Sequence, residues 1–323
     1  GYGRIVRDYD DNMLCITEEK DADEETKLIN EINTGIMCIP ANWLTEALSQ
    51  LDNNNAQGEY YLTDLIAKAV NQGIEINSVT CEDEMEVAGI NNRVQLAEVE
   101  SYYQQLQATE LMMSGVTFRD PARVDIRGDI KAGQDITIDI NVIFEGNNTI
   151  ADNVSIGANC IIINSIIHEG AEILPNSIIE NAEVGTDCSV GPFARLRPGT
   201  KLADKAKVGN FVEVKNANIG LGSKINHLSY IGDTDMGADV NIGAGTITCN
   251  YDGANKHRTV IGDRVFGGSD TQLVAPVTIE DGATIGAGST IRKTVPGDAL
   301  TLTKSEQKTV KGWQRPIKKK QEG

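Results

Sequence analysis

The chain has 323 residues, enough for about two domains, and its 40% apolar but only 5% aromatic composition favours aliphatic cores. Its formal net charge of −18 argues against general nucleic-acid binding, which needs a basic face. Six cysteines without C-x-x-C spacing are typical of reduced thiols in a cytosolic protein, and no apolar run approaches the roughly 20 residues of a membrane span.

Residues 1–90 show an α/β pattern in which short strands alternate with helices. The expected elements are a strand near Cys38, an amphipathic helix over 42–51, a helix over 63–70 and a strand over 74–80. This segment is too short for a complete doubly wound domain, so we interpret it as part of one.

Residues 91–113 give the strongest helix prediction in the chain, and Gly115 is expected to end it. Five apolar residues fall mostly on one stripe of this helix: Val94, Val99, Tyr102, Leu106 and Met113. Because a repeating pattern follows almost at once, the sequence predicts a connecting arm over 91–115.

From about residue 130 to residue 293 an aliphatic residue returns at every sixth position, often followed by Gly. This period is typical of a parallel β-helix, in which each hexad is one short strand and one turn. The aliphatic residues are expected to point inward, and the coils must stack because no single coil can bury its own core. The predicted inward residues are Ile150, Ile156, Ile162, Val184, Val190, Leu196, Leu202, Val208, Val214, Ile219, Ile225, Ile231, Met236, Ile242, Ile261, Leu273, Ile279, Ile285 and Ile291.

Two segments depart from the repeat. Residues 248–259 break the register and are too polar for a core, so they predict a loop that leaves the coil, where function tends to lie. The segment from Pro296 drops the pattern, and its basic end is either a solvated tail or a local site for an anion. The basic residues are Lys308, Lys311, Arg315, Lys318, Lys319 and Lys320.

Three histidines are candidates for chemistry: His168 in a plain coil, His257 in the predicted loop, and His227 two residues after Ile225. A lone histidine in a solenoid is more often an ordinary surface residue than a catalyst. A neutral imidazole is nevertheless suited to removing a proton from an attacking amine near pH 7. No zinc pattern, P-loop or G-x-S-x-G motif is present.

Three cations, Arg197, Lys215 and Lys256, would suit a phosphate group, although each taken singly reads as an ordinary surface cation. Stacking of coils would bring such positions together. The company of Tyr230 and Asn241 raises the interest of His227 in the same way.

Several motifs closely resemble the bacterial bifunctional N-acetylglucosamine-1-phosphate uridyltransferase / glucosamine-1-phosphate acetyltransferase family. In the repeat region they are GPFARLRPG (191–199), VGNFVEVK (208–215), NIGAGTITCNYDGANK (241–256) and GSDTQLVAPV (268–277). In the first part they are GYGRI (1–5), EEKDA (18–22), INTG (32–35), NNNAQGEYY (53–61) and GINNR (89–93). The resemblance therefore covers the whole chain.

The resemblance implies part of a nucleotidyltransferase (Rossmann-like) domain over 1–90, an arm over 91–115 and a left-handed parallel β-helix of hexapeptide repeats over 116–323. It also implies a cytoplasmic homotrimer that transfers the acetyl group of acetyl-CoA to glucosamine-1-phosphate. His227 would be the general base, and the sugar phosphate would meet Arg197, Lys215, Tyr230, Asn241 and Lys256. Acetyl-CoA would meet Ala244, Asn250, Tyr251, Ser269, Ala287 and Lys304.

Three departures from the family pattern matter. The family usually has Arg where this chain has Lys304, and Gly267 falls on an inward position where an aliphatic residue is expected. The family's glycine-rich nucleotide loop and magnesium-binding Asp precede residue 1, so we expect no uridyltransferase activity from the chain as given. The remnant of that site would be Gly3, Glu18, Asn33 and Asn91, with Asn91 as a Mg²⁺ ligand.

Two functions remain open from the sequence. One is the acetyltransferase, whose intact parent would also make UDP-N-acetylglucosamine for cell-wall and lipopolysaccharide synthesis. The other is a non-catalytic β-helix that scaffolds or regulates a sugar nucleotidyltransferase. A scaffold needs neither His227 nor the loop over 248–259.

Overall fold

The computed structural model describes residues 1–303 and 306–315, and the chain divides into two compact units that meet at residues 102 and 103. Helix α3 (Arg93–Met113) contributes residues to both units. None of the helices among the described residues is long and apolar enough to cross a membrane.

The N-terminal unit contains an antiparallel hairpin and two short helices. Strands β1 (Arg4–Arg7) and β2 (Met13–Thr17) pair with each other, and α2 (Asp64–Asn71) packs against β2. The remaining elements are α1 (Ala41–Leu48) and the 3₁₀ turns η1 (Thr26–Leu28) and η2 (Glu84–Val87). Its small core includes Ile5, Ile16, Leu65 and Ala69.

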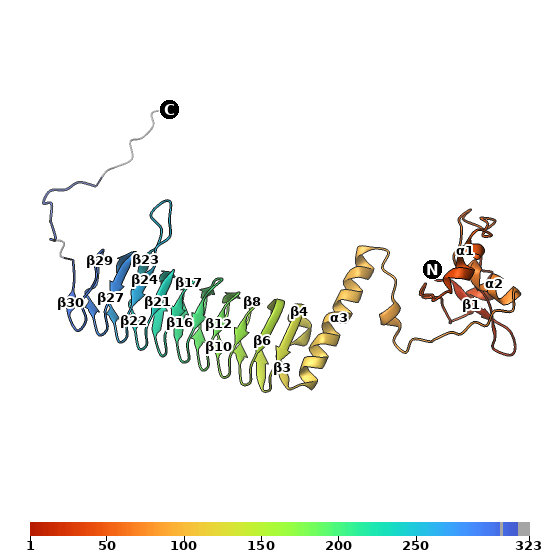
Figure 1. The fold of residues 1–323 in the computed structure, drawn as a ribbon, viewed down its shortest axis with the longest axis horizontal. Helices are drawn as coiled ribbons and strands as arrows, with labels where there is room; N and C mark the ends of the chain where they lie inside the picture. The colour runs from red at the N-terminus through yellow and green to blue at the C-terminus, as the bar shows by residue number, and fades with distance from the viewer. Residues whose placement is uncertain (304–305, 316–323) are drawn as a thin grey trace, which may run out of the picture. The chain divides into compact units, whose positions relative to one another are not determined.

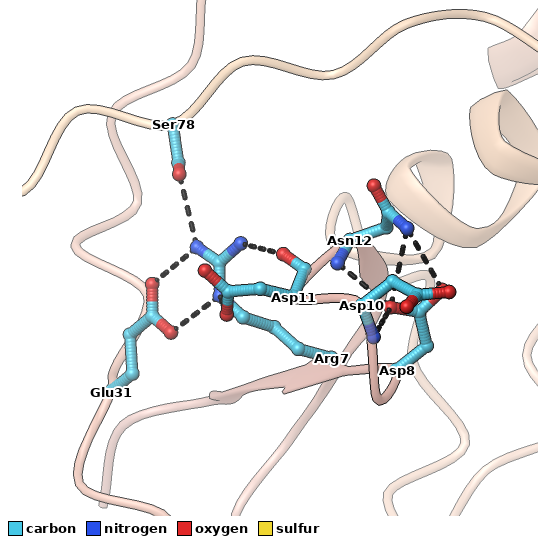
Figure 2. A network of polar contacts seen from close by, with 7 residues as sticks. All are labelled: Arg7, Asp8, Asp10, Asp11, Asn12, Glu31 and Ser78. Atoms are coloured by element: carbon cyan, nitrogen blue, oxygen red, sulfur yellow. Dashed lines mark hydrogen bonds and ion pairs between the residues drawn. The ribbon is translucent and has the colours of Figure 1, made fainter.

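Arg7 connects the hairpin to two distant segments, as Figure 2 shows. Its guanidinium donates to both carboxylate oxygens of Glu31, at 2.7 and 2.8 Å, and to Ser78 Oγ at 3.0 Å. This ion pair lowers the pKa of Glu31. The turn itself is closed by the Asp8 carboxylate, which accepts the backbone N–H groups of Asp10 and Asn12 at 2.9 and 2.8 Å.

The helix predictions for this unit are confirmed within a few residues, but the two strands expected near Cys38 and over 74–80 are wrong. Both segments are irregular, and they hold side chains as exposed as Ile36 (79%) and Val79 (97%). A strand needs a neighbour that pairs with its backbone, and the outer edge of β1 is taken by a bridge between Arg4 and Ile32 and by the Ile5 N–H to Glu31 carbonyl bond of 3.0 Å. The α/β pattern of the sequence is therefore realised as one hairpin with helices.

Helix α3 is confirmed, but it packs on the repeats through Ala108, Leu111 and Met112 rather than through the predicted stripe. Leu106 and Met113 of that stripe are exposed. The small Ala108 lets the helix approach the first coil closely. The side chain of Gln104, on the same helix, pairs with the exposed backbone of that coil. Gln104 donates to the carbonyl of Ile126 at 2.9 Å and accepts its N–H at 2.8 Å, so it replaces a missing strand.

The second unit is a left-handed parallel β-helix, as predicted, with three stacks of short parallel strands (Figure 1). The first stack consists of β3 (Val116–Phe118), β5 (Ile136–Ile138), β7 (Ser155–Ile156), β10 (Glu172–Ile173), β13 (Ser189–Val190), β16 (Lys207–Asn210), β19 (Lys224–His227), β22 (Asn241–Ile242), β25 (Phe266–Gly267), β28 (Thr284–Ile285) and β30 (Leu300–Thr301).

Two long strands, β4 (Val124–Ala132) and β6 (Val142–Ile150), join the other two stacks, and the 3₁₀ turn η3 (Pro121–Arg123) precedes them. The second stack continues with β8 (Ile161–Ile163), β11 (Ile178–Glu180), β14 (Arg195–Leu196), β17 (Glu213–Lys215), β20 (Tyr230–Gly232), β23 (Ile247–Cys249), β26 (Gln272–Val274) and β29 (Thr290–Ile291). The third continues with β9 (Ile166–Ile167), β12 (Glu183–Val184), β15 (Lys201–Leu202), β18 (Asn218–Ile219), β21 (Thr234–Met236), β24 (Thr259–Ile261) and β27 (Val277–Ile279).

The hexad prediction is confirmed along the whole β-helix, since every aliphatic residue predicted to point inward is buried. Gly267 occupies the same column, in register with Ile242 and Ile285. A Cβ placed there would lie 3.6 Å from its nearest neighbours, which is ordinary contact, so the position leaves room for a methyl group.

The acidic composition has a structural cause at the corners of the coils. Asp152 accepts the backbone N–H of Gln134 at 2.8 Å, and Asp204 accepts that of Thr186 at 2.9 Å. Each bond joins one coil to the next at a turn where the strand ladder is interrupted. Part of the negative charge therefore holds the coils together and is no sign of a cationic partner.

Candidate active site

His227 stands at the end of β19, at the corner between the first and second stacks, and its side chain is exposed. Its Nδ1 lies 2.8 Å from Oδ1 of Asn210, the residue in register with it on the preceding coil. An amide oxygen only accepts hydrogen bonds, so Nδ1 carries the proton and Nε2 keeps a free lone pair. This is the tautomer that a general base requires.

In the coils that follow His227, the same corner of the β-helix carries only small side chains. The register runs from Ile225 through Ile242 and Gly267 to Ile285, so the residues two positions later share one column. In the three coils after His227 these residues are Ala244, Ser269 and Ala287. We call this column the ledge. Three of the predicted cofactor residues are thus brought together beneath the histidine.

Ala244, the first residue of the ledge, has a carbonyl that accepts the N–H of Asp270 at 2.7 Å. Its own N–H donates to no other described residue. This donor lies one coil from His227, and strands in neighbouring coils are about 4.8 Å apart. The ledge therefore presents a free hydrogen-bond donor close to the histidine.

The three predicted cations form one cluster. Arg197 follows β14 and Lys215 ends β17 in the next coil, with an Arg197 N–H to Val214 carbonyl bond of 2.9 Å between the two coils. Lys256 reaches the same place from the loop between β23 and β24. Direct contact with the Lys256 ammonium and repulsion from it, with smaller effects of burial and Arg197, lower the pKa of Lys215.

Among the described residues, Glu213 makes the one salt bridge of the cluster, while Asp233 acts on Lys215 and Glu180 acts on Arg197 at longer range. The Oε1 of Glu213 lies 2.7 Å from Nη1 of Arg197, and this contact raises the pKa of Arg197. Of the three cations, only Arg197 is bonded directly to a carboxylate of a described residue. Lys215 and Lys256 make no salt bridge with a described residue, so their ammonium groups can bind a dianion such as a phosphate monoester.

Tyr230 and Asn250 meet above Gly232, the residue that follows Lys215 in the same column. A Cβ on Gly232 would lie 2.5 Å from the Tyr230 hydroxyl and 2.8 Å from Nδ2 of Asn250. A side chain at position 232 would therefore displace one or both of these groups, and glycine leaves room for them. Asn250 is buried and donates to Oδ2 of Asp233 at 2.5 Å, so its amide is fixed.

The loop between β23 and β24 leaves the coil, as predicted, and stands out from the β-helix in Figure 1. Tyr251 and Lys256 face each other in an antiparallel bridge across it. Tyr251 is 60% exposed, and its hydroxyl donates to the Gly253 carbonyl at 2.6 Å. The loop therefore presents one aromatic ring and one ammonium group to solvent.

Not every predicted residue joins this arrangement. Asn241 lies in register with Lys224, at the opposite end of β19 from His227, and Lys304 falls outside the described residues. In the N-terminal unit the Asn33 N–H donates to the Gly3 carbonyl at 2.8 Å, and Glu18 lies beside Gly3.

For Asn91, no hydrogen bond between described residues links it directly to Gly3, Glu18 or Asn33, although the nearby Gly89 N–H donates to the Tyr2 hydroxyl at 2.6 Å. The backbone N–H of Asn91 donates instead to Oε1 of Gln95 at 2.8 Å. Among the residues that the structure describes, no group of three or more His, Cys, Asp or Glu residues is placed to hold a metal ion.

Sequence reasoning missed Asn210, Glu213 and Gly232. Asn210 precedes His227 by one coil, so the repeat length itself could have found it. The roles of Glu213 and Gly232 depend on the conformations of neighbouring side chains, and the repeat does not fix these conformations. The buried thiols Cys160 and Cys188 are not rival nucleophiles, because burial raises the pKa of each to about 11.

Two surface hollows of about 450 and 350 Å³ lie away from these residues. The first is lined by residues of β24 and β27, and the second by residues of α3 and β4. Unlike these two hollows, the column of His227, Ala244, Ser269 and Ala287 lies on an open corner of the β-helix and is not enclosed by other described parts of the chain. A ligand there would need a second wall.

Comparison with known families matches two parts of the β-helix. Residues 126–224 match the GMPPB C-terminal domain, and residues 258–293 match the bacterial transferase hexapeptide family of six repeats. Among solved structures, the UDP-N-acetylglucosamine acyltransferase from Campylobacter jejuni aligns with a TM-score of 0.39 at 13% identity, over 58% of this chain and 71% of that one.

Curated relatives match almost the whole chain. The bifunctional protein GlmU of Cupriavidus pinatubonensis is 55% identical over 319 residues, which cover 99% of this chain and 70% of the relative. That of Ralstonia pickettii is 54% identical over 323 residues, which cover 100% of this chain and 71% of the relative. The similarity thus includes the N-terminal unit as well as the β-helix.

Proposed function

The chain belongs to the family of bifunctional GlmU proteins, and we propose that its β-helix transfers the acetyl group of acetyl-CoA to the amine of glucosamine-1-phosphate. The observation that carries this proposal is the position of His227. Its Nε2 is free, it stands at the head of the ledge, and the cluster of Arg197, Lys215 and Lys256 lies on the neighbouring stack.

The reaction begins when the substrate amine attacks the thioester carbonyl carbon. His227 Nε2 takes the amine proton, while Asn210 holds the imidazole through Nδ1. The tetrahedral oxyanion accepts a hydrogen bond from the Ala244 N–H. Its collapse breaks the carbon–sulfur bond, and the imidazolium returns the proton to the departing CoA thiolate.

The small side chains of the ledge suit the long, narrow pantetheine arm of CoA. We assign the arm to Ala244, Ser269 and Ala287, where it would lie along the coils below His227. Asn250, Tyr251 and Lys304 are assigned to CoA by the family resemblance. An exposed ring such as that of Tyr251 offers a face for stacking.

The phosphate end of the substrate is assigned to Arg197, Lys215 and Lys256. Binding of a dianion would relieve the repulsion that now lowers the pKa of Lys215. Tyr230 and Asn241 are assigned to the sugar, and Asn241 would reach it from a neighbouring subunit because it lies apart from His227 in one chain.

A homotrimer would provide the second wall of the site. Phe193, Phe211 and Leu228 are between 50% and 62% exposed and lie at corners of successive coils. All three have positive φ (48 to 56°), where bulky residues are uncommon, and the two rings stack with centroids 5.3 Å apart. This apolar corner has the character of a surface covered by another copy.

The intact relatives carry a second activity, which we assign to their nucleotidyltransferase domain together with its Mg²⁺ ion and the synthesis of UDP-N-acetylglucosamine. Asn91 is our proposed ligand, but the described residues do not by themselves fit the ion, which prefers carboxylates. No step of acetyl transfer uses it. A cytoplasmic location fits the supply of both substrates.

The test is release of free CoA thiol from acetyl-CoA by the purified chain, with and without glucosamine-1-phosphate. We expect release only when the sugar phosphate is present, together with an acetylated product of matching mass. A chain that binds neither substrate and releases no thiol would support the alternative, a non-catalytic β-helix scaffold. Light scattering tests the trimer separately, and a stable monomer with full activity on dilution would contradict it.

A further inference from the structure

Lys215 and Lys256 lie together although their charges repel. The repulsion is strong enough to lower the pKa of Lys215, and the nearby Asp233 offsets it only in part. The two lysines also come from different places, since Lys215 ends a strand of the coil and Lys256 lies on the protruding loop. Something other than their mutual interaction must therefore hold Lys256 where it is.

The carboxylate of Asp252 connects the two arms of the loop that carries Lys256. Asp252 accepts the backbone N–H groups of Ala254 and Asn255 at 2.8 and 2.7 Å, and its Oδ2 lies 2.7 Å from Nε2 of His257. The N–H of Asn255 first, and then the His257 side chain, lower the pKa of Asp252 well below its usual range. Asp252 thus stays ionised, and it joins the two arms of the loop.

The two ends of the loop are tied to the coil by other residues. Asn250 donates to Asp233 at 2.5 Å, and Arg258 pairs with Asp235 through two guanidinium nitrogens. The His257 N–H also donates to the Asn250 carbonyl at 2.8 Å. With the base of the loop fixed in this way, two side-chain contacts remain at its tip besides the Asp252 bonds to backbone N–H groups: the Tyr251 hydroxyl to the Gly253 carbonyl, and Asp252 to His257. The second of these lies next to Lys256 in the sequence.

We infer that the Asp252–His257 pair is a clip that positions Lys256 against Lys215, which makes His257 a positioning residue for substrates that carry a phosphate monoester. The inference rests on the proposed function, since it assumes that the three cations bind the phosphate. It gives His257 a role distinct from that of His227. The clip holds two like charges ready for a dianion, so that little of the loop has to move on binding.

The experiment compares wild type, His257→Ala, Lys256→Ala and the double variant by steady-state kinetics. His257→Ala should raise KM for glucosamine-1-phosphate about three- to tenfold, in line with the loss of one partly exposed charged contact. The kcat should stay within about twofold, because His227 and the ledge are untouched, and KM for acetyl-CoA should change less than KM for the sugar phosphate. In the Lys256→Ala background, His257→Ala should add nothing further.

His168→Ala is the matched control, because His168 makes a similar exposed contact with Glu183, at 3.1 Å, in a plain coil. It should change no kinetic constant. His257→Gln, which keeps a side-chain donor, should recover part of the lost affinity. A readout besides activity is NMR titration of ¹³C-methylated lysines, where His257→Ala should move the pKa of Lys215 upward as Lys256 departs.

Two results would overturn the clip alone: an unchanged KM in His257→Ala while Lys256→Ala raises it, or equal effects of His257→Ala in both backgrounds. An unchanged KM in Lys256→Ala would instead overturn the proposed phosphate site, and the clip with it. Circular dichroism melting of each variant shows whether the β-helix is intact.

Discussion

The two units of the chain differ in how completely they bury their own apolar side chains. In the β-helix Ile231 is 0% exposed, and the other inward residues are buried in the same way, whereas Ile36 in the N-terminal unit is 79% exposed. The cause lies in the strand pairing. Away from the ends of the stacks, each β-helix strand pairs with strands in the coils before and after it, while the hairpin of β1 and β2 gains only a short bridge between Arg4 and Ile32. A repeating fold completes its core within one chain, and an isolated hairpin does not.

The largest expected effect comes from replacing one isoleucine in each unit with aspartate, a buried one in the β-helix and an exposed one in the N-terminal unit. Ile231→Asp should unfold or misfold the β-helix, since an unpaired buried carboxylate costs more than about 4 kcal/mol. Ile36→Asp should change the free energy of unfolding by less than about 0.5 kcal/mol, because the side chain is already in water. Denaturant unfolding followed by circular dichroism measures both. If both substitutions changed the free energy of unfolding equally, the two isoleucines would be equally buried in the folded protein.

Next in size is the loss of the proposed base. His227→Ala should lower kcat for acetylation about 10²- to 10⁴-fold while the melting temperature stays unchanged, because the side chain lies on the surface of a coil. Asn210→Ala should lower kcat less, by about tenfold, through loss of the tautomer. Near-full kcat in the first variant would reduce His227 to a corner residue and send the search for a base to Tyr230, His257 or a bound water.

A smaller effect is expected from pH. The pKa of Lys215 is lowered by Lys256, so Lys215 loses its proton at a lower pH than an ordinary lysine, and affinity for a phosphate dianion should fall as pH rises through that value. Inhibition by glucose-1-phosphate, which has the phosphate but no amine to titrate, measures this directly. Lys256→Met removes the repulsion, so its weaker binding should decline only at higher pH. An identical pH dependence in both proteins would show that the two lysines are not coupled.

The smallest effect concerns one buried hydroxyl in the core of the β-helix. Thr259 is 0% exposed, and its hydroxyl has no hydrogen-bond partner among the described residues, while Val277 fills the same column in the next coil. Thr259→Val should therefore stabilise the β-helix by about 1 kcal/mol. Thr234→Val is the control, because the Thr234 hydroxyl donates to the Gly232 carbonyl at 2.9 Å and its loss should not stabilise. Thermal melts decide between the two.

The same difference between the units decides what could be predicted from the sequence. A six-residue period identifies Ile156 or Val208 as inward without any knowledge of the fold, and it makes Asn210 and His227 neighbours by coil length alone. It does not fix the rotamers of the outward side chains. The meeting of Tyr230 with Asn250 depends on space left by Gly232, and the Arg197–Glu213 pair depends on rotamers.

Non-repeating segments were predicted less well. The apolar residues around Cys38 and from Ile74 to Thr80 have the composition of strands, but a strand also needs a partner that composition does not reveal. The face by which α3 packs was missed for a similar reason. Small Ala108 sets the closest approach, and a pattern search gives most weight to large residues.

The protruding loop is an insertion into one coil, and the neighbouring coils have no such insertion. Ile242 follows Ile225 by 17 residues in register, whereas Gly267 follows Ile242 by 25, and the strands on both sides still pair. The extra length therefore disturbs neither core nor ladder, and loop closure entropy grows only slowly with length. Natural variation could lengthen, recharge or delete this segment at little cost to folding. The same architecture could then evolve from an inert spacer to a ligand-binding coil, or back, through changes at one place in the chain.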